Sequence, residues 1–158
     1  MKLIRANNDS LVFRLTRAEK QAFTHLLELY PLVPASHQRL TKGVQGKAVE
    51  EGQQLLDEAL AEQRAANRRQ LNDWLKVPER FRAAKNSFSF TLMRSDVDWL
   101  LQVLNDIRVG SWLLLGSPEE PLDPEDVPKD LTGLWAAMEI TGLFQMRLLH
   151  AVEGRPIE

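Results

Sequence analysis

Short stretches in which apolar and polar residues alternate occur in two parts of the chain. Residues 2–6 and 11–15 flank the polar, turn-forming run 7–10, an arrangement typical of a β-hairpin. Residues 87–93 alternate again, with three large apolar residues on one face. The pattern predicts a small antiparallel sheet built from an N-terminal hairpin and one central strand.

In the first half, apolar residues spaced by three and four predict two helices. Thr16 precedes Glu19 by three positions, the spacing of a capping box, so a helix is expected to start there and to end before Pro31. Residues 47–75 contain no proline and many good helix formers. At ~1.5 Å per residue this second helix would span roughly 45 Å, so we expect it to bend or to project from the domain.

The second half predicts two more helices. Ser95 and Asp98 again have capping-box spacing, and the helix that follows them is expected to end at Gly116. Residues 131–152 are apolar almost all round, which indicates a helix buried on several sides, in the core or against a partner subunit. The fold class is therefore α+β and largely helical, with the small sheet packed against about four helices and the last helix central.

Residues 13–30 resemble residues 90–107 when the chain is shifted by 77 positions. Both segments combine a strand, a helix start and an amphipathic helix. A duplicated strand–helix unit would explain the similarity, and so would any strand that leads into a capped helix. In either case the two strands could pair in one sheet.

Composition indicates one domain and gives no sign of an oxidising compartment. The chain has 158 residues, 44% of them hydrophobic, and no cysteine. It therefore has no disulfide, no thiolate nucleophile and no zinc site that needs sulfur. The start of the chain lacks the pattern of a signal peptide, and no stretch reaches the ~20 apolar residues of a membrane span. We expect a soluble, cytoplasmic protein with no membrane association.

The net charge of -2 hides strongly charged blocks. Residues 50–62 sum to -5 and residues 63–85 to +5, while residues 117–130 form an acidic, proline-rich loop with a sum of -5. The candidate basic patch consists of Arg64, Arg68, Arg69, Arg80, Arg82 and Lys85.

Three interpretations of these basic residues stay open. The order of acids first and arginines last along residues 47–75 suits the helix dipole. Alternatively, the patch binds a phosphate-bearing or acidic partner, or it docks the acidic loop, within one chain or across a dimer. Nucleic acid is a disfavoured partner, because the total charge is slightly negative and no aromatic residues interleave the arginines of residues 64–70.

No catalytic motif emerges from the sequence. The Gly-x-Ser-x-Gly pattern of serine hydrolases does not occur, and the three histidines are scattered. We expect no catalytic residue, no metal site and no cofactor.

Four charged residues interrupt the two most apolar helical segments, and buried charges need partners. Arg108 or Arg147 is expected to pair with Glu139 or Asp106. The alternative is that these four residues line the pocket of a small-molecule-binding or enzymatic domain.

The same two segments carry tryptophan and methionine, which protein interfaces enrich. The candidate interface residues are Trp112, Trp135, Met138 and Met146. The function predicted from these features is a non-catalytic interaction protein, regulatory or adaptor in kind, of the bacterial cytosol and homodimeric.

The run Asp-Val-Asp-Trp-Leu-Leu-Gln-Val-Leu-Asn-Asp-Ile-Arg at residues 96–108, followed by the acidic loop and a closing helix with Trp135, resembles an uncharacterised bacterial domain family. In that family a leucine-rich helix ends in an Asn/Asp-hydrophobic-Arg signature. The resemblance covers about 60 residues of the C-terminal half. It implies a small cytosolic protein with no assigned activity or cofactor. Genes of the family are often found beside the adaptor of the Clp protease, which implies a role in proteostasis.

Overall fold

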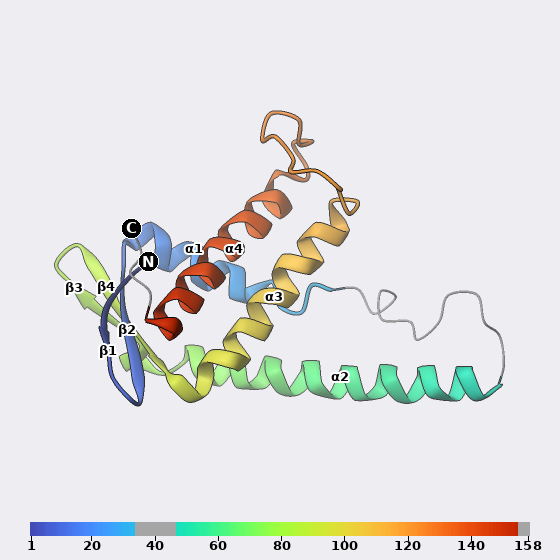
Figure 1. Cartoon of the computed structure of the whole chain (residues 1–158), viewed down its shortest axis with the longest axis horizontal. Helices are drawn as coiled ribbons and strands as arrows, with labels where there is room; N and C mark the ends of the chain where they lie inside the picture. Colours follow the sequence, from blue (N-terminus) through green and yellow to red (C-terminus); the bar gives the residue numbers. More distant parts are fainter. Residues whose placement is uncertain (34–46, 155–158) are drawn as a thin grey trace.

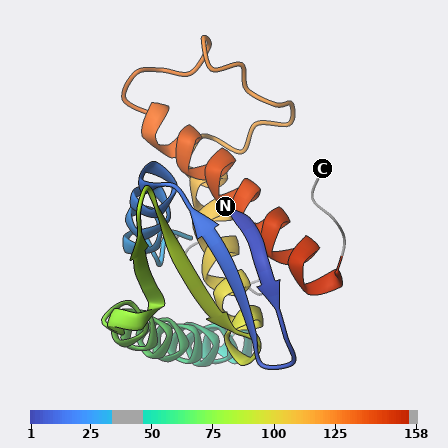
Figure 2. The same cartoon turned by 90° about the vertical axis from the view of Figure 1, so that its left-hand side faces the viewer.

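A four-stranded antiparallel sheet with helices on one of its faces forms the body of the protein (Figures 1 and 2). The structure is a computed structural model that describes residues 1–33 and 47–154. The sheet order is β1-β2-β4-β3, and the strands are β1 (Lys2–Ala6), β2 (Ser10–Leu15), β3 (Phe81–Ala84) and β4 (Ser87–Met93). The helices are α1 (Arg17–Glu28), α2 (Lys47–Leu75), α3 (Val97–Leu114) and α4 (Thr132–Glu153).

The α+β fold class, the three strands and the four helices expected from the sequence are confirmed. The fourth strand, β3, is additional. It pairs only with β4, at the edge of the sheet, and its four residues Phe-Arg-Ala-Ala show no apolar alternation. A short edge strand needs little burial, so its sequence carries little of the usual signal.

One of the two expected capping boxes is present. The Thr16 hydroxyl accepts from the Glu19 amide at 3.1 Å, and the Glu19 carboxylate accepts from the Thr16 amide at 2.9 Å. The box expected at Ser95 is wrong: a 3-10 turn, Arg94–Asp96, occupies this position, and α3 starts at Val97 without a side-chain cap.

The core lies between the inner face of the sheet and α1, α3 and α4. Phe23 of α1 is central: its ring lies 5.4 Å from that of Phe90 on β4 and 5.0 Å from that of Phe144 on α4. Phe13 on β2 stacks on Phe90 at 5.9 Å. All four rings are buried. They join both central strands to helices from both halves of the chain.

The order of elements repeats, because strand, strand, helix, helix occurs twice. We call residues 1–75 the N-terminal unit and residues 78–153 the C-terminal unit. Residues related by the shift of 77 share fully buried positions: Phe13 and Phe90, Phe23 and Leu100, Leu27 and Leu104, and Leu71 and Leu148 are each 0% exposed. Phe13 also lies directly opposite Phe90 in the β2–β4 register, as a local twofold axis between the two strands requires. The structure thus favours duplication over coincidence.

The second helices of the two units differ in their surroundings. Helix α4 packs along α3, whereas α2 runs past the end of the sheet, and its first turns stand clear of the body (Figure 1). The expectation that one end of α2 projects is confirmed. Helix α1 has 12 residues and α3 has 18, so α1 is too short to accompany α2 over its 29 residues. None of the helices in the described part of the chain has the length and apolar character that a bilayer crossing needs.

Candidate functional site

The outer face of α4 is a row of apolar side chains exposed to solvent. Leu143, Met146 and Leu149 are 51%, 43% and 45% exposed, and their spacing of three places them along one side of the helix. Phe144 and Leu148, on the opposite side, are buried in the core. One side of α4 thus packs in the core, and the other side is exposed to solvent.

Charged residues frame this apolar row. Exposed Glu139 and Glu153 lie seven residues before and after Met146, and exposed Arg108 of α3 lies beside Gly142. A shallow hollow of about 400 Å³ lies at this helix–helix boundary, lined by Arg108, Gly142, Gln145, Met146, Leu149, His150 and Glu153. We call the apolar row together with Arg108, Glu139 and Glu153 the α4 face.

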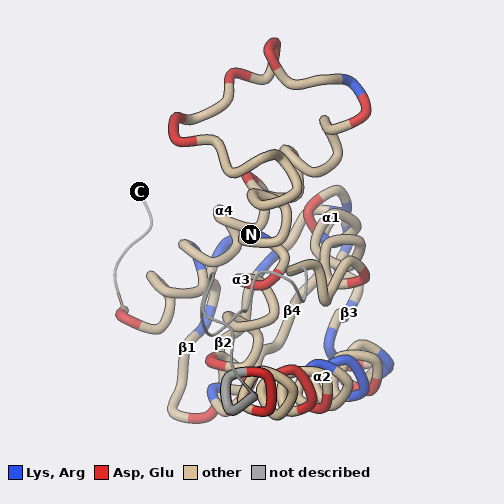
Figure 3. Tube along the Cα trace, turned by 90° about the vertical axis from the view of Figure 1, so that its right-hand side faces the viewer, with Lys and Arg blue, Asp and Glu red and all other residues tan. Residues whose placement is uncertain are grey.

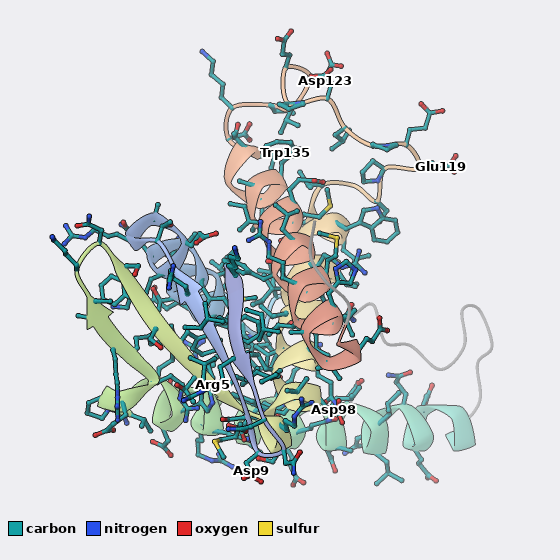
Figure 4. All side chains as sticks on the ribbon, turned by 60° about the vertical axis from the view of Figure 1, so that its left-hand side comes forward. Arg5, Asp9, Asp98, Glu119, Asp123 and Trp135 are labelled. Atoms are coloured by element: carbon teal, nitrogen blue, oxygen red, sulfur yellow. The ribbon has the colours of Figure 1, made fainter. Side chains whose placement is uncertain are left out.

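The four residues predicted for an interface fall in different surroundings. Met146 belongs to the α4 face, and Trp135, three helical turns before it, points to the same side by the helical repeat. Trp135 is half-buried at the start of α4 (Figure 4), and its indole N–H is buried with no hydrogen-bond partner in the described part of the chain. Met138 is half-buried. Trp112, 37% exposed, donates its indole N–H to the Pro118 carbonyl at 3.1 Å and so ties α3 to the acidic loop.

The predicted pairing of Arg108 or Arg147 with Glu139 or Asp106 is wrong. Arg147 reaches Glu19 of α1 at 3.6 Å and also donates to the Met1 carbonyl. Arg108 and Glu139 are exposed on the α4 face and form no ion pair among the described residues. Sequence spacing placed these residues on apolar helices but could not show which side of each helix faces solvent.

Asp106 has a structural role on the inner side of α3. Its Oδ1 accepts from the amides of Leu32 and Val33 at 2.6 and 3.2 Å, and its Oδ2 lies 4.0 Å from an Arg64 nitrogen. One helical turn further on, a Cβ on Gly110 would lie 2.6 Å from the Leu32 carbonyl carbon. The segment that follows α1 is therefore held against α3 by the Asp106 carboxylate. It can approach α3 closely because Gly110 has no side chain.

The six residues of the predicted basic patch divide between two places. On α2, Arg64 faces Asp106, and Arg68 donates to the carbonyls of Tyr30 and Glu28 at 2.6 and 3.1 Å. Exposed Arg69 follows them on the same helix. The other three, Arg80, Arg82 and Lys85, lie at or next to the β3 edge of the sheet.

The acidic loop lies far from this edge. Figure 1 shows β3 on the side of the molecule away from the loop that joins α3 and α4, and Figure 4 shows Glu119 and Asp123 of this loop projecting from the body. Within one chain, the loop therefore does not dock on the basic residues of the sheet.

Comparison with protein-family models, with curated proteins and with solved structures finds no match to this chain. The resemblance to the family found beside the Clp adaptor stays a prediction. Within residues 1–33 and 47–154, no three His, Asp or Glu side chains gather where they could hold a metal ion.

Proposed function

We propose that the protein is a non-catalytic interaction protein that forms a homodimer through the α4 face. The observation that carries the proposal is the uncovered row Leu143, Met146 and Leu149 on a helix whose other side is buried. Contiguous exposed apolar side chains with a polar rim mark protein-interaction surfaces.

A second copy of the chain can cover the apolar row. In an antiparallel pair of α4 helices that cross at Met146, Glu153 of one copy lies opposite Glu139 of the other, and the partner's Arg108, which lies beside Gly142, is within about one helical turn of both. Each Arg108 then offsets part of the repulsion between these two acids, and the apolar rows cover each other.

A regulatory or adaptor role in the cytoplasm is the wider form of this proposal. The acidic loop projects from the body beyond the α3 and α4 ends (Figures 1 and 2). A projecting acidic segment offers a contact for a further protein. The absence of cysteine supports a reducing compartment.

The alternative of an enzymatic or small-molecule pocket around Asp106, Arg108, Glu139 and Arg147 has less support. Asp106 and Arg147 are engaged elsewhere, and of the four only Arg108 lines the hollow on the α4 face.

The test is the mass in solution by light scattering after size exclusion. The wild-type chain is expected at twice 18.1 kDa, and Met146→Asp at 18.1 kDa with an unchanged circular dichroism spectrum. Leu55→Asp is the matched control, because Leu55 is 68% exposed on α2, away from the α4 face, and this variant should remain dimeric. A monomeric wild-type protein at micromolar concentrations, or a dimeric Met146→Asp, would overturn the proposal.

A further inference from the structure

The outer face of the sheet is basic. Helices α1, α3 and α4 lie behind the sheet in Figure 2, and α2 lies at its lower end. On this outer face the Lys and Arg side chains are exposed, whereas Val12 in the middle is buried. The strand register places Lys2, Arg14, Ser89 and Arg82 in one row across the four strands. Arg5, Val12 and Thr91 form the next row. Four of these seven residues are cations and none is an acid.

A hollow of about 420 Å³ crosses this face. Three arginines and two hydroxyl side chains line it, and Glu79 is its one acid; the lining residues are Arg5, Val12, Val77, Glu79, Arg80, Arg82, Ser89, Thr91 and Met93. The hollow therefore has a net positive charge and neutral hydrogen-bond donors. That combination suits phosphate groups, since arginine binds phosphate in a bidentate manner and Ser and Thr hydroxyls donate to phosphate oxygens.

Arg80 is held rigidly at the margin of the hollow. Its guanidinium stacks 4.2 Å from the Trp74 ring centre and donates to the carbonyls of Trp74 and Thr91 at 3.1 and 3.4 Å. Asp96 lies 3.7 Å away and balances part of its charge. Arg5 and Arg82 are exposed and form no ion pair among the described residues. They are the two arginines available to a ligand.

Arg5 and Arg82 are related by the shift of 77, so each unit supplies one of them. They lie on the two edge strands and are offset by one row. From the spacing of strands and of residues along a strand, their Cα atoms are roughly 16 Å apart. This distance exceeds what a single phosphate can bridge and suits a chain of phosphates that crosses the sheet.

We propose that the open face of the sheet binds the phosphate backbone of a single-stranded nucleic acid, with Arg5 and Arg82 as its principal contacts. No aromatic side chain lies in the hollow, so the contacts go to the backbone and carry no base preference. The small total charge of the chain does not reveal this basic face, because most acids lie elsewhere: Figure 3 shows many of them on the acidic loop and along α2. Glu79 and Asp96 are the acids near the hollow. The site is independent of the proposed dimer.

Fluorescence anisotropy with a labelled thymidine 15-mer tests the proposal, with poly-glutamate as competitor. We expect binding that weakens with salt, with a slope of log K against log salt near -2 to -3 for three or four phosphate contacts. Arg5→Ala and Arg82→Ala should each weaken binding several-fold and reduce the magnitude of the salt slope by about 0.7, the value for one phosphate contact on a single strand. Arg69→Ala, an exposed arginine of α2 outside the hollow, is the matched control and should bind like the wild type.

Three results would overturn the proposal. The first is no binding of the 15-mer at low salt. The second is equal affinity of the wild type, Arg5→Ala and Arg82→Ala. The third is displacement of the 15-mer by poly-glutamate at an equal concentration of charges, which would identify an acidic peptide as the occupant. The same titration of Met146→Asp separates the two proposals, since the open face should bind whether or not the α4 face forms a dimer.

Discussion

The N-terminal and C-terminal units share a core but differ at their surfaces. Both contribute fully buried residues at matched positions, from Phe13 and Phe90 on the central strands to Leu71 and Leu148 on the second helices. In contrast, Arg69 on α2 corresponds to Met146 on α4 at the same shift of 77. The same packing plan thus supports one helix whose outer side is charged and one whose outer side is apolar. This difference is the reason why we propose α4, and not α2, as the helix that a partner covers.

The junctions between the units also correspond. Glu19 at the start of α1 and Asp96 before α3 are related by the shift of 77. Each carboxylate interacts with one group of the other unit and with one group that precedes it in its own unit. Asp96 accepts the Trp74 indole N–H at 3.1 Å and pairs with Arg80, while Glu19 pairs with Arg147 and with the N-terminal ammonium group. Each second helix is therefore anchored at the start of the other unit's first helix.

The largest expected effect comes from the central ring pair. Phe13→Ala and Phe90→Ala should each lower the free energy of unfolding by about 3–5 kcal/mol, because both rings are fully buried. Urea unfolding followed by circular dichroism measures the loss. If the two units contribute equivalent cores, the two losses should agree within about 1 kcal/mol. A small loss of stability for one variant and a large loss for the other would show that the two units do not contribute equally to the core. Phe13→Leu and Phe90→Leu provide milder variants if either alanine variant does not fold.

A smaller effect is expected at Gly110, where α3 lies close to the segment that follows α1. In Gly110→Ala the new Cβ would lie 2.6 Å from the Leu32 carbonyl carbon, so α3 and the segment after α1 must move apart. We expect a loss of about 1–3 kcal/mol in the free energy of unfolding. Gly133→Ala is the matched control in α4, since a Cβ there meets nothing within 4 Å, and it should be neutral or slightly stabilising. Equal behaviour of the two variants would contradict the close contact.

The smallest effect is a pH dependence at Glu19. Burial raises the pKa of this carboxyl, but the hydrogen bonds from the N-terminal ammonium and from Thr16 outweigh burial, and the pKa lies below its ordinary value of 4.5. A lowered pKa in the folded state means that Glu19 stabilises the fold above pH 4.5 and that this contribution is lost as the pH falls through the lowered pKa.

Urea unfolding between pH 3 and pH 6 tests this expectation. The stability of the wild type should fall on acidification more steeply than that of Glu19→Gln, which has no titrating group at this position. Parallel pH profiles would show that the ion pair does not contribute.

Local patterns of the sequence predicted most of the fold. Alternation identified three strands, and spacing of three and four identified four helices, because both signals repeat over neighbouring residues. The edge strand β3 lacks alternation, and the box at Ser95 failed because the chain there forms a 3-10 turn whose aspartate, Asp96, turns to Trp74. Spacing alone does not reveal such a long-range partner.

The site residues were harder to predict than the fold. In a helix that is apolar all round, the sequence does not distinguish Leu143 and Leu149 from core residues. Only the packing shows that they face solvent. Arg5 is absent from the predicted basic patch because only the strand register sets it on the same face as Arg82. The shift of 77 that aligns these two arginines was the one signal in the sequence that could have found the pair.

The anchoring of α2 at one end has a consequence for how the helix opens. No side chain between residues 50 and 70 is buried, whereas Leu71 and Trp74 are. Isolated helical turns are marginally stable in water, and local opening costs less where few apolar groups are buried. Amide hydrogens in the first turns of α2 should therefore exchange through local fraying, and those near Trp74 only when the whole fold opens. Protection of the amides from hydrogen exchange would thus increase along this one continuous helix. At its start the protection would be that of an isolated peptide helix, and near Trp74 it would be that of the whole fold.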